Sequence, residues 1–330
     1  MYDVYGIGNA LVDIEYKITD DFLVSQGVEK GLMTLVDEQR QSELLLALDN
    51  INANKSCGGS AANTAIAISQ FGGNSFYSCK VANDDFGHFY LDDMENNGVK
   101  TNNHSTSLPE GTTGKCMVFV SDDGERSMNT FLGITQTFSS ECLNYDELKK
   151  AKWLYVEGYL VASETGMVAA KEAIEFARKN QIKVAITLSD LNMVTYFKDN
   201  FLKLIGDSPI DLLFANTQEA QGFVQNDDLQ FCFEELKKYS QTFVVTQGEK
   251  GATYWNGSEL VHVDANPLRP LDTNGAGDLF AGAFLYGISK DYTDVKKLEL
   301  AIKACSVLIM QYGARLEKEQ ALQIKSDLGV

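Results

Sequence analysis

The chain has 330 residues, of which 44% are hydrophobic, so it can bury the core of one large domain or of two small ones. Its formal net charge of −18 argues against a nucleic-acid or anionic-membrane partner, because broad phosphate contacts need an excess of Lys and Arg. A local phosphate pocket is compatible with this charge, because backbone N–H groups can build one without basic side chains.

The N-terminal stretch and the cysteines bear on the compartment. MYDVYGIGNALVDI lacks the basic start of a signal peptide, and no run of about 18 apolar residues could span a bilayer. Six cysteines are scattered without a C-x-x-C pair, and three histidines show no metal-ligand spacing. We therefore expect a cytoplasmic protein with reduced cysteines.

The first half of the chain predicts one core strand, two helices and several strands of another kind. DVYGIGN (3–9) suits a central strand, and DEQRQSELLLAL and GGSAANTAIAISQF suit helices. Alternating stretches typical of half-buried strands occur at 12–19, 31–36, 114–121 and 126–133. We predict that these strands form a small separate sheet, hinged as a lid over the core.

The second half alternates strands with helices. KWLYVEG (152–158) predicts a buried strand and TGMVAAKEAIEFARKN (165–180) a helix, and further strands follow at KVAITLS, DLLFAN and TFVVTQG. Short Val-, Ile- and Leu-rich strands that alternate with helices favour a mainly parallel sheet with helices on both faces, which is a three-layer α/β/α core. Ligands of such folds bind at the carboxyl ends of the strands.

One stretch of the second half is suited to hold an anion. In DTNGAGD (272–278), Gly275, Ala276 and Gly277 can turn their N–H groups inward, because the glycines carry no Cβ that would block a tight turn. A helix begins near Asp278 and offers free N–H groups and the positive end of its dipole. A transferred phosphate could be held there while Asp278 accepts a proton. This stretch alone fits a glycine turn with Asp278 as a simple N-cap equally well.

A second stretch, CGGSAANTAIAISQFGG (57–73), is suited to bind hydroxyl groups. Gly58 and Gly59 let the backbone approach a ligand closely, and Asn63 can both donate and accept hydrogen bonds. The alternative is an ordinary loop before a small-residue helix. Two other glycine patterns are excluded, because GIGNAL (6–11) ends in leucine and GTTGKC (111–116) lacks P-loop spacing. A dinucleotide dehydrogenase or a P-loop ATPase would lack its defining residues.

The early GG followed by Asn and the late DTNGAGD together resemble the two signatures of the PfkB (ribokinase-like) family of carbohydrate and nucleoside kinases. The resemblance extends over essentially the whole chain. It implies a single ribokinase-like domain of residues 1–330, with a lid formed by segments at about 12–36 and 112–133. Within the family, GIGNALVDI, ERSMNTFLG and Asn274 make the chain most similar to adenosine kinases.

The resemblance implies roles for the residues that match the family's motifs. Asp278 would be the general base, with Gly275, Ala276 and Gly277 as the anion hole. The positions that match binders of sugar hydroxyls are Asn9, Asp13, Gly58, Gly59 and Asn63.

A second set of matches concerns ATP and metal. Asn216 and Glu219 of NTQEA match an N-x-x-E motif that organises Mg²⁺ and phosphate through water. Thr246, Gly248 and Gly251 match a nucleotide-binding turn beside ATP, and Arg126 in the lid could approach the triphosphate. A monovalent cation such as K⁺ is a further candidate cofactor.

The expected reaction is transfer of phosphate from ATP to the 5′-hydroxyl of a nucleoside, as in adenosine to AMP, a step of purine salvage. A nucleobase needs an apolar slot, and the candidates to line it are Met33, Leu35, Phe131 and Leu132. The alternative role of these four is lid core or a dimer contact, so both a monomer and a homodimer joined through the lid are open.

A sugar kinase acting on ribose, fructose or 2-keto-3-deoxygluconate is the main alternative. Ala10 and GGSAAN depart from the pattern of many adenosine kinases, and GGSAAN is closer to that of sugar kinases. A nucleoside-binding protein without catalysis is the third reading, but it would not require the intact Asp278 and its GAG turn.

Overall fold

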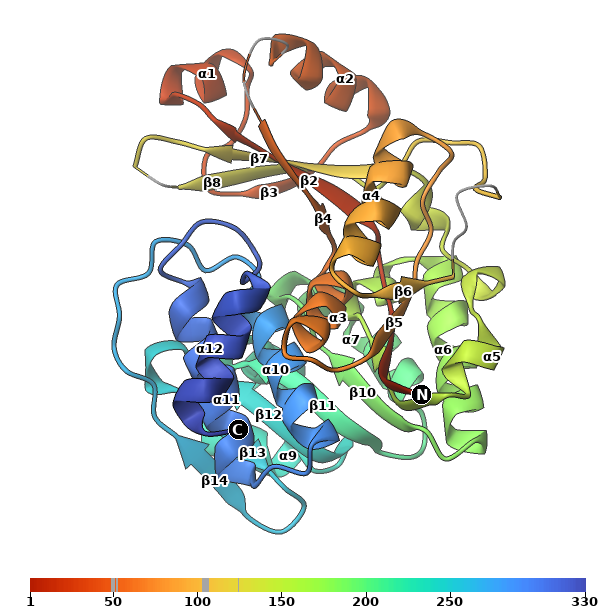
Figure 1. Cartoon of the computed structure of the whole chain (residues 1–330), viewed down its shortest axis with the longest axis vertical. Coiled ribbons are helices and arrows are strands. Elements are labelled where there is room, and N and C mark those ends of the chain that lie inside the picture. The colour runs from red at the N-terminus through yellow and green to blue at the C-terminus, as the bar shows by residue number, and fades with distance from the viewer. Residues whose placement is uncertain (49–50, 52, 103–106, 124) are drawn as a thin grey trace.

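The main sheet lies at the centre of a three-layer core in the computed structural model, which describes residues 1–48, 51, 53–102, 107–123 and 125–330 (Figure 1). Its strand order is β14-β13-β12-β11-β10-β9-β1-β5-β6. The seven strands β12, β11, β10, β9, β1, β5 and β6 pair in parallel with their neighbours, whereas β13 and β14 add an antiparallel edge. The strands are β1 (Tyr2–Ile7), β5 (Ser75–Ser78), β6 (Lys100–Thr101), β9 (Ala151–Val156), β10 (Lys183–Thr187), β11 (Ile210–Asn216), β12 (Ser240–Thr246), β13 (Ala252–Trp255) and β14 (Leu260–Val263).

Helices cover both faces of this sheet, as the alternation of strands and helices predicts. One face carries α3 (Ser60–Gln70), α4 (Asp85–Asn96), α10 (Ala276–Ser289), α11 (Asp294–Leu308) and α12 (Lys318–Leu328). The other carries α5 (Tyr145–Leu148), α6 (Glu164–Lys179), α7 (Leu191–Ile205), α8 (Thr217–Val224) and α9 (Leu229–Leu236). Short 3₁₀ turns lie at η1 (Gly133–Thr137), η2 (Ser140–Cys142), η3 (Gly158–Ala162) and η4 (Gly248–Lys250).

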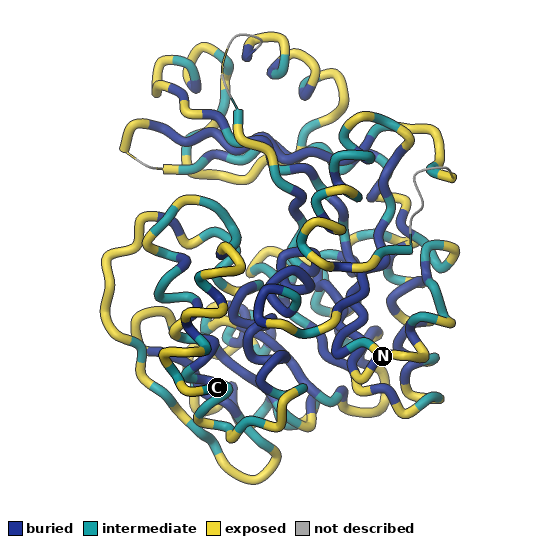
Figure 2. The backbone as a smooth tube through the Cα atoms, in the orientation of Figure 1, coloured by how far each residue is buried: buried dark blue, intermediate teal, exposed yellow. Residues whose placement is uncertain are grey.

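The buried strands divide their side chains between two hydrophobic clusters. On β1, Val4 packs with the α3 and α10 side, whereas Tyr5 and Ile7 pack with the α6 and α7 side. This division follows from the period of two along a strand. Figure 2 shows the result as a dark-blue centre beneath a mostly exposed outer surface.

The lid is a separate sheet above the core, with strand order β3-β8-β7-β2-β4 (Figure 1). Its strands are β2 (Leu11–Lys17), β3 (Met33–Leu35), β4 (Ala53–Gly58), β7 (Gly114–Val120) and β8 (Arg126–Phe131), and α1 (Asp20–Ser25) and α2 (Glu38–Ala47) lie above them. The sequence interpretation missed β4, because ANKSCG is a polar edge strand without hydrophobic alternation. The first lid excursion therefore runs to Gly58, beyond the predicted residue 36.

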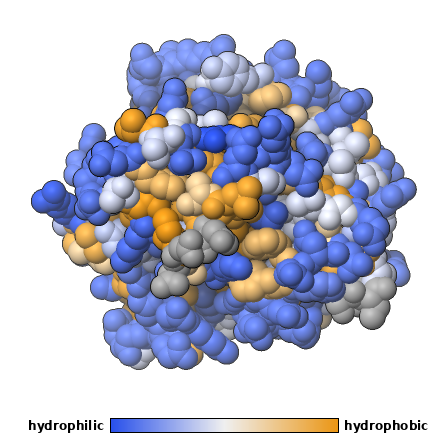
Figure 3. Space-filling view, turned by 90° about the horizontal axis from the view of Figure 1, so that it is seen from above, coloured by the Kyte–Doolittle hydropathy of each residue, from blue (hydrophilic) through white to orange (hydrophobic). Residues whose placement is uncertain are grey.

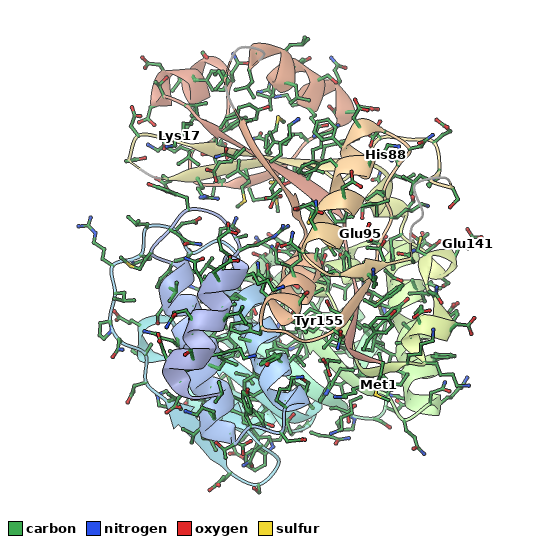
Figure 4. All side chains as sticks on the ribbon, viewed as in Figure 1. Met1, Lys17, His88, Glu95, Glu141 and Tyr155 are labelled. Carbon is green, nitrogen blue, oxygen red and sulfur yellow. The ribbon has the colours of Figure 1, made fainter. Side chains whose placement is uncertain are left out.

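The two faces of the lid have different partners. The outer face, which includes Val12, Ile14 and Tyr16, packs with Leu23 and Leu44 of the lid helices in the main hydrophobic cluster. The inner face alternates with it along β2 and carries Asp13 and Glu15. We name it the inner face because Arg126, on the same side, forms an ion pair with Asp272 of the core. Figure 4 shows Lys17 on the lid and Tyr155 in the core below it.

Candidate active site

Asp278 lies in the first turn of α10, where two side chains of α3 donate hydrogen bonds to its carboxylate. Ser60 Oγ is 2.6 Å from Oδ1, and Asn63 Nδ2 is 3.0 Å from Oδ2. Burial raises the pKa of Asp278 to about 6, although these hydrogen bonds and the charge of Arg315 lower it. A base of this strength is ionised at neutral pH and accepts a proton more readily than an exposed aspartate.

The turn before Asp278 has the geometry of an anion site. Gly275 is the N-cap of α10 with a φ of 72°, and a Cβ there would lie 2.4 Å from the backbone oxygen of Ala314. A Cβ on Gly277 would meet nothing within 4 Å, so the space beside the turn is open. The first N–H groups of a helix have no partner within it, and α10 directs them to this space at the positive end of its dipole. The helix begins at Ala276, two residues before the predicted start.

A cavity of about 470 Å³ adjoins this turn. Ala276 and Gly277 line it on one side, and the predicted nucleotide-binding residues Thr246, Gly248 and Gly251 line it on another. Its apolar wall includes Leu268, Pro270, Phe280, Ile302 and Ile309. A nucleotide requires this combination, because the flat faces of its base pack against apolar side chains and its phosphates are anionic.

The residues predicted to bind hydroxyl groups lie together where the lid joins the core. A Cβ on Gly58 would lie 2.4 Å from the Asp13 carboxylate, and one on Gly59 would lie 2.1 Å from the Asn9 backbone oxygen. Both glycines are therefore required by the close approach of Asp13 and Asn9, and their predicted approach to a ligand stays a prediction. Burial raises the pKa of Asp13 to about 6, with Arg315 acting in the opposite direction.

Glu157 holds this group together and was not predicted. Its Oε1 accepts from the Asn9 backbone N–H at 3.2 Å and from Asn9 Nδ2 at 2.9 Å, while Oε2 accepts from the Ala61 N–H at 2.9 Å. The side chain is buried, and this burial raises its pKa to about 7. Its position directly after β9, at the carboxyl end of a core strand, is a signal that could have identified it.

Arg315 is a second functional candidate that sequence reasoning missed. It follows the YGA of the loop between α11 and α12, and its guanidinium reaches Asn63, Asp93 and Cys57. No motif of the sequence marks it. Only the folded chain brings it to the pocket.

Asn216 and Glu219 lie at the carboxyl end of β11 and form a capping box. The side chain of Asn216 accepts from the Glu219 N–H at 2.9 Å, and Glu219 Oε2 accepts from the Asn216 N–H at 3.0 Å. Burial is the main cause that raises the pKa of Glu219 to about 7; the hydrogen bond from the Asn216 N–H acts against it, and the charges of Asp190 and Asp278 act with it. Asn216 pairs with Thr246 across β11 and β12, so the two predicted cofactor groups are neighbours.

Arg126 lies on the inner face of the lid, between lid and core. Its Nη2 is 2.7 Å from Glu15 Oε2 on the lid and 2.9 Å from Asp272 Oδ2 on the core. Asp272 also accepts from the N–H groups of Asn274 and Gly313. The guanidinium is thus linked to the loop that leads into the GAG turn, and its predicted approach to a triphosphate stays a prediction.

The predicted base-binding residues divide between the two faces of the lid. Met33 and Leu35 pair with Met128 and Thr130, on the face of Arg126, and are 46% and 62% exposed, so their surface is free to cover a ligand. Phe131 instead pairs with Lys115, which donates to Gln41 of α2 on the outer face. The expectation that Phe131 stacks on a base therefore needs correction, because the strand register turns it away from Asp13.

The remaining lid candidate, Leu132, follows β8 and is partly buried. Val118, Val120 and Cys116 form a small cluster with Met128, separate from the main core. Across the register, Cys116 pairs with Asp13 and Val118 pairs with Glu15. The inner face is therefore apolar beside the Asp13 carboxylate.

Two features were sought in the described residues and not found. Among the described residues, no group of three or more His, Cys, Asp or Glu side chains is arranged to hold a metal ion. None of the described helices has the length and hydrophobicity needed to cross a membrane. The prediction of K⁺ remains untested.

The fold and the site together define a kinase of the ribokinase-like class. The model of the PfkB family, described as "pfkB family carbohydrate kinase", matches residues 33–321, so the chain belongs to this family. The structure is similar to adenosine kinase from Sinorhizobium meliloti, with a TM-score of 0.88 and 35% identity over 99% of both chains. A probable sugar kinase from Rhizobium etli CFN 42 gives a TM-score of 0.87 and 33% identity, again over 99% of both chains. Ribokinase from Lactococcus lactis is 27% identical over 82% of this chain and 85% of its own.

Proposed function

We propose that the protein transfers the terminal phosphoryl group of ATP to the 5′-hydroxyl of a nucleoside, with adenosine as the preferred acceptor. The observation that carries this proposal is the apolar inner face of the lid beside Asp13. Met33 and Leu35 expose side chains there, and Leu35 lies in register across the sheet, through Thr130 and Cys116, with Asp13, whose carboxylate is suited to ribose hydroxyls. A nucleoside needs both surfaces, whereas a free sugar needs only the second.

The roles follow from the geometry around α10. The open side of Gly277 and the cavity beside it would hold the phosphates of ATP. Asp278 would accept the proton of the 5′-hydroxyl as the hydroxyl oxygen bonds to phosphorus and the bond to ADP breaks. Phosphoryl transfer needs positioning and charge stabilisation more than covalent help, so a carboxylate held by Ser60 and Asn63 is sufficient.

Mg²⁺ would neutralise charge on the phosphates of ATP when it is bound. The carboxylate of Glu219 fits an indirect role, because its oxygens are engaged by Asn216 yet each retains a lone pair for water. Asp190 and Asp278 lie near enough for their charges to raise its pKa, so the region favours a cation. Glu219 and Asn216 would therefore hold the metal through water molecules.

The lid would close over the bound nucleoside. Closure would bring Met33 and Leu35 over the base and exclude water, which otherwise hydrolyses ATP. The outer face of the lid is packed by its own helices, so the exposed apolar side chains of β3 are on the side that faces the core.

A sugar kinase is the second candidate. The observation that favours it is the pair of hydrogen bonds that Glu157 accepts from Asn9 and Ala61, because they hold together polar groups suited to a small polyol without using the lid. The probable sugar kinase from Rhizobium etli is also nearly as similar to this chain as the adenosine kinase.

A coupled ADP-release assay distinguishes the two. The panel is adenosine, inosine, guanosine, ribose, fructose and 2-keto-3-deoxygluconate. We expect kcat/KM for adenosine to exceed that for each sugar by at least about 100-fold, or roughly 2.7 kcal/mol. A free sugar with the highest kcat/KM would overturn the nucleoside assignment and leave the kinase intact, whereas ADP release that no acceptor stimulates would overturn both.

A further inference from the structure

Arg315 joins three separate elements through one guanidinium. Nε lies 3.0 Å from Asn63 Oδ1 on α3, Nη1 lies 3.0 Å from Asp93 Oδ2 on α4, and Nη2 lies 3.0 Å from Cys57 Sγ on β4. Its side chain is only 14% exposed. A planar guanidinium with donors on three sides can hold three acceptors at fixed angles, which no other side chain can do.

The bond to Asn63 has a consequence for Asp278. A primary amide can present either its oxygen or its NH₂ group on a given side. Arg315 has donors only, so it selects the Asn63 oxygen and turns the NH₂ group towards Asp278 Oδ2, at 3.0 Å. One N–H of Asn63 then remains for a substrate hydroxyl. Arg315 thereby determines which way Asn63 faces the carboxylate.

The charge of Arg315 also reaches the carboxylates of the pocket. It lowers the pKa of both Asp278 and Asp13, whereas burial raises both. The other titratable groups that interact with Asp278 are Asp13 of β2, Tyr155 of β9, Glu157 and Tyr159 after β9, Glu219 of α8 and Cys305 of α11. In their ionised forms these groups are all negative, so they oppose ionisation of Asp278 and Arg315 favours it.

We infer that Arg315 is a positioning residue for phosphoryl transfer, which orients Asn63 against Asp278 and supplies the positive charge that keeps this carboxylate ready to accept a proton. The inference rests on the proposed role of Asp278 as the general base. The competing explanation is purely structural, in which the Arg315–Asp93 ion pair only fastens α4 to the loop before α12.

The pH profile separates the two explanations. The test measures kcat and kcat/KM for the best acceptor of the panel over roughly pH 5.5 to 9, together with the thermal midpoint, for wild type, R315M, R315K and a control. The control is R178M, because Arg178 likewise ties its helix to another segment through its guanidinium, which donates to the backbone oxygens of Ile205 and Ser208, but it lies on α6 at the opposite face of the sheet.

For R315M we expect a loss of kcat near neutral pH of roughly 10-fold to 100-fold, as for a misplaced reacting group. The acid limb of its kcat/KM profile should move to higher pH, so that part of the loss is recovered in alkaline buffer. R315K should keep the wild-type limb because it keeps the charge, but should lose kcat because an ammonium cannot hold Asn63 and Asp93 in the same fork. R178M should lower only the thermal midpoint.

A wild-type acid limb in R315M, with activity that falls only in proportion to stability, would overturn the inference. If R315M does not fold, R315Q carries the same test, because its amide keeps a donor for Asn63 and removes the charge. A wild-type enzyme that releases ADP without regard to any acceptor would instead overturn the proposed function, and this inference with it. The two failures are therefore distinguishable from the wild-type assay alone.

Discussion

Asp278 experiences opposing effects at the residue scale. Burial raises its pKa to about 6, and the hydrogen bonds from Ser60 and Asn63 lower it. A carboxylate with this pKa is charged at neutral pH and still binds a proton well enough to receive one during the reaction. The same residue on an exposed helix end would be a weaker base.

The variant D278N tests this role. We expect it to fold, to bind nucleoside and to lose about 10²- to 10⁴-fold in kcat, the usual range for a positioned base. The matched control is D294N, because Asp294 also lies in the first turn of a helix, α11, where it bonds to Lys297. Steady-state kinetics and an isothermal binding titration give the answer. If D278N kept more than half of the wild-type kcat, Asp278 would be a helix cap only.

At the scale of elements, the register of the lid decides which residues can touch a base. The pairings β3–β8 and β7–β8 place Met33 and Leu35 on the inner face and Phe131 on the outer face. A single-residue shift of β8 would move Phe131 to the inner face, because side chains alternate along a strand.

Polar substitution on the inner face should therefore weaken nucleoside binding selectively. We expect L35S to raise KM for adenosine by about 5- to 20-fold with little change in kcat, because lost apolar contact is mostly uniform binding. The KM for a free sugar should stay the same. F131L on the outer face is the control and should change stability more than KM. Equal effects of L35S on adenosine and on ribose would contradict the proposed slot.

The lid and core are joined by the ion pair of Arg126 with Asp272, so the lid position should depend on it. We expect nucleoside to lower the radius of gyration of wild type, because a hinged lid closes on its ligand. Without ligand, R126M should have a larger radius of gyration than wild type. Its KM for nucleoside should be raised about 3- to 10-fold, as expected for the loss of a partly buried ion pair. Small-angle scattering with and without nucleoside measures the first effect. A radius that nucleoside leaves unchanged in wild type would argue against closure.

At the scale of the whole molecule, part of the negative charge is gathered around Asp278, whose charge acts on Asp13, Glu157 and Glu219. Seen from above, the surface is mostly hydrophilic with a few hydrophobic patches (Figure 3). Inside, burial raises the pKa values of Asp13 and Asp278 to about 6 and those of Glu157 and Glu219 to about 7. Such a cluster costs stability wherever its members are ionised, which is where they are needed for function.

The pH dependence of stability follows with a definite sign. Because these pKa values are higher in the folded than in the unfolded chain, the folded state binds more protons between about pH 4 and pH 7, and the free energy of unfolding falls as the pH rises through this window. We expect the thermal midpoint without ligand to drop by roughly 5 °C or more from pH 5 to pH 8. In D278N the drop should be smaller, so the thermal midpoint of this variant should rise relative to that of wild type as the pH rises. A midpoint that rises steadily to pH 8 would contradict the burial of these charges.

Much of this protein was readable from the sequence because the signals are local. The alternation at 152–158, 165–180 and beyond predicted β9, α6, β10, β11 and β12, and DTNGAGD predicted a glycine turn before a helix. Hydrophobic period and glycine content are properties of a few neighbouring residues, so they survive without knowledge of the fold. The family followed from the same motifs.

Tertiary structure decided the rest, because those features depend on contacts between distant residues. Asn63 and Arg315 are 252 positions apart, and Asn9 and Glu157 are 148 apart, so no local pattern marks either pair. The polar strand β4 exists because β2 pairs with it, and the face of Phe131 is set by its pairing with Lys115. The alternation of side chains along the sequence shows that a strand has two faces, but only pairing and packing determine which face meets the core. The raised pKa values of the carboxylates around Asp278 follow from the burial that this packing creates.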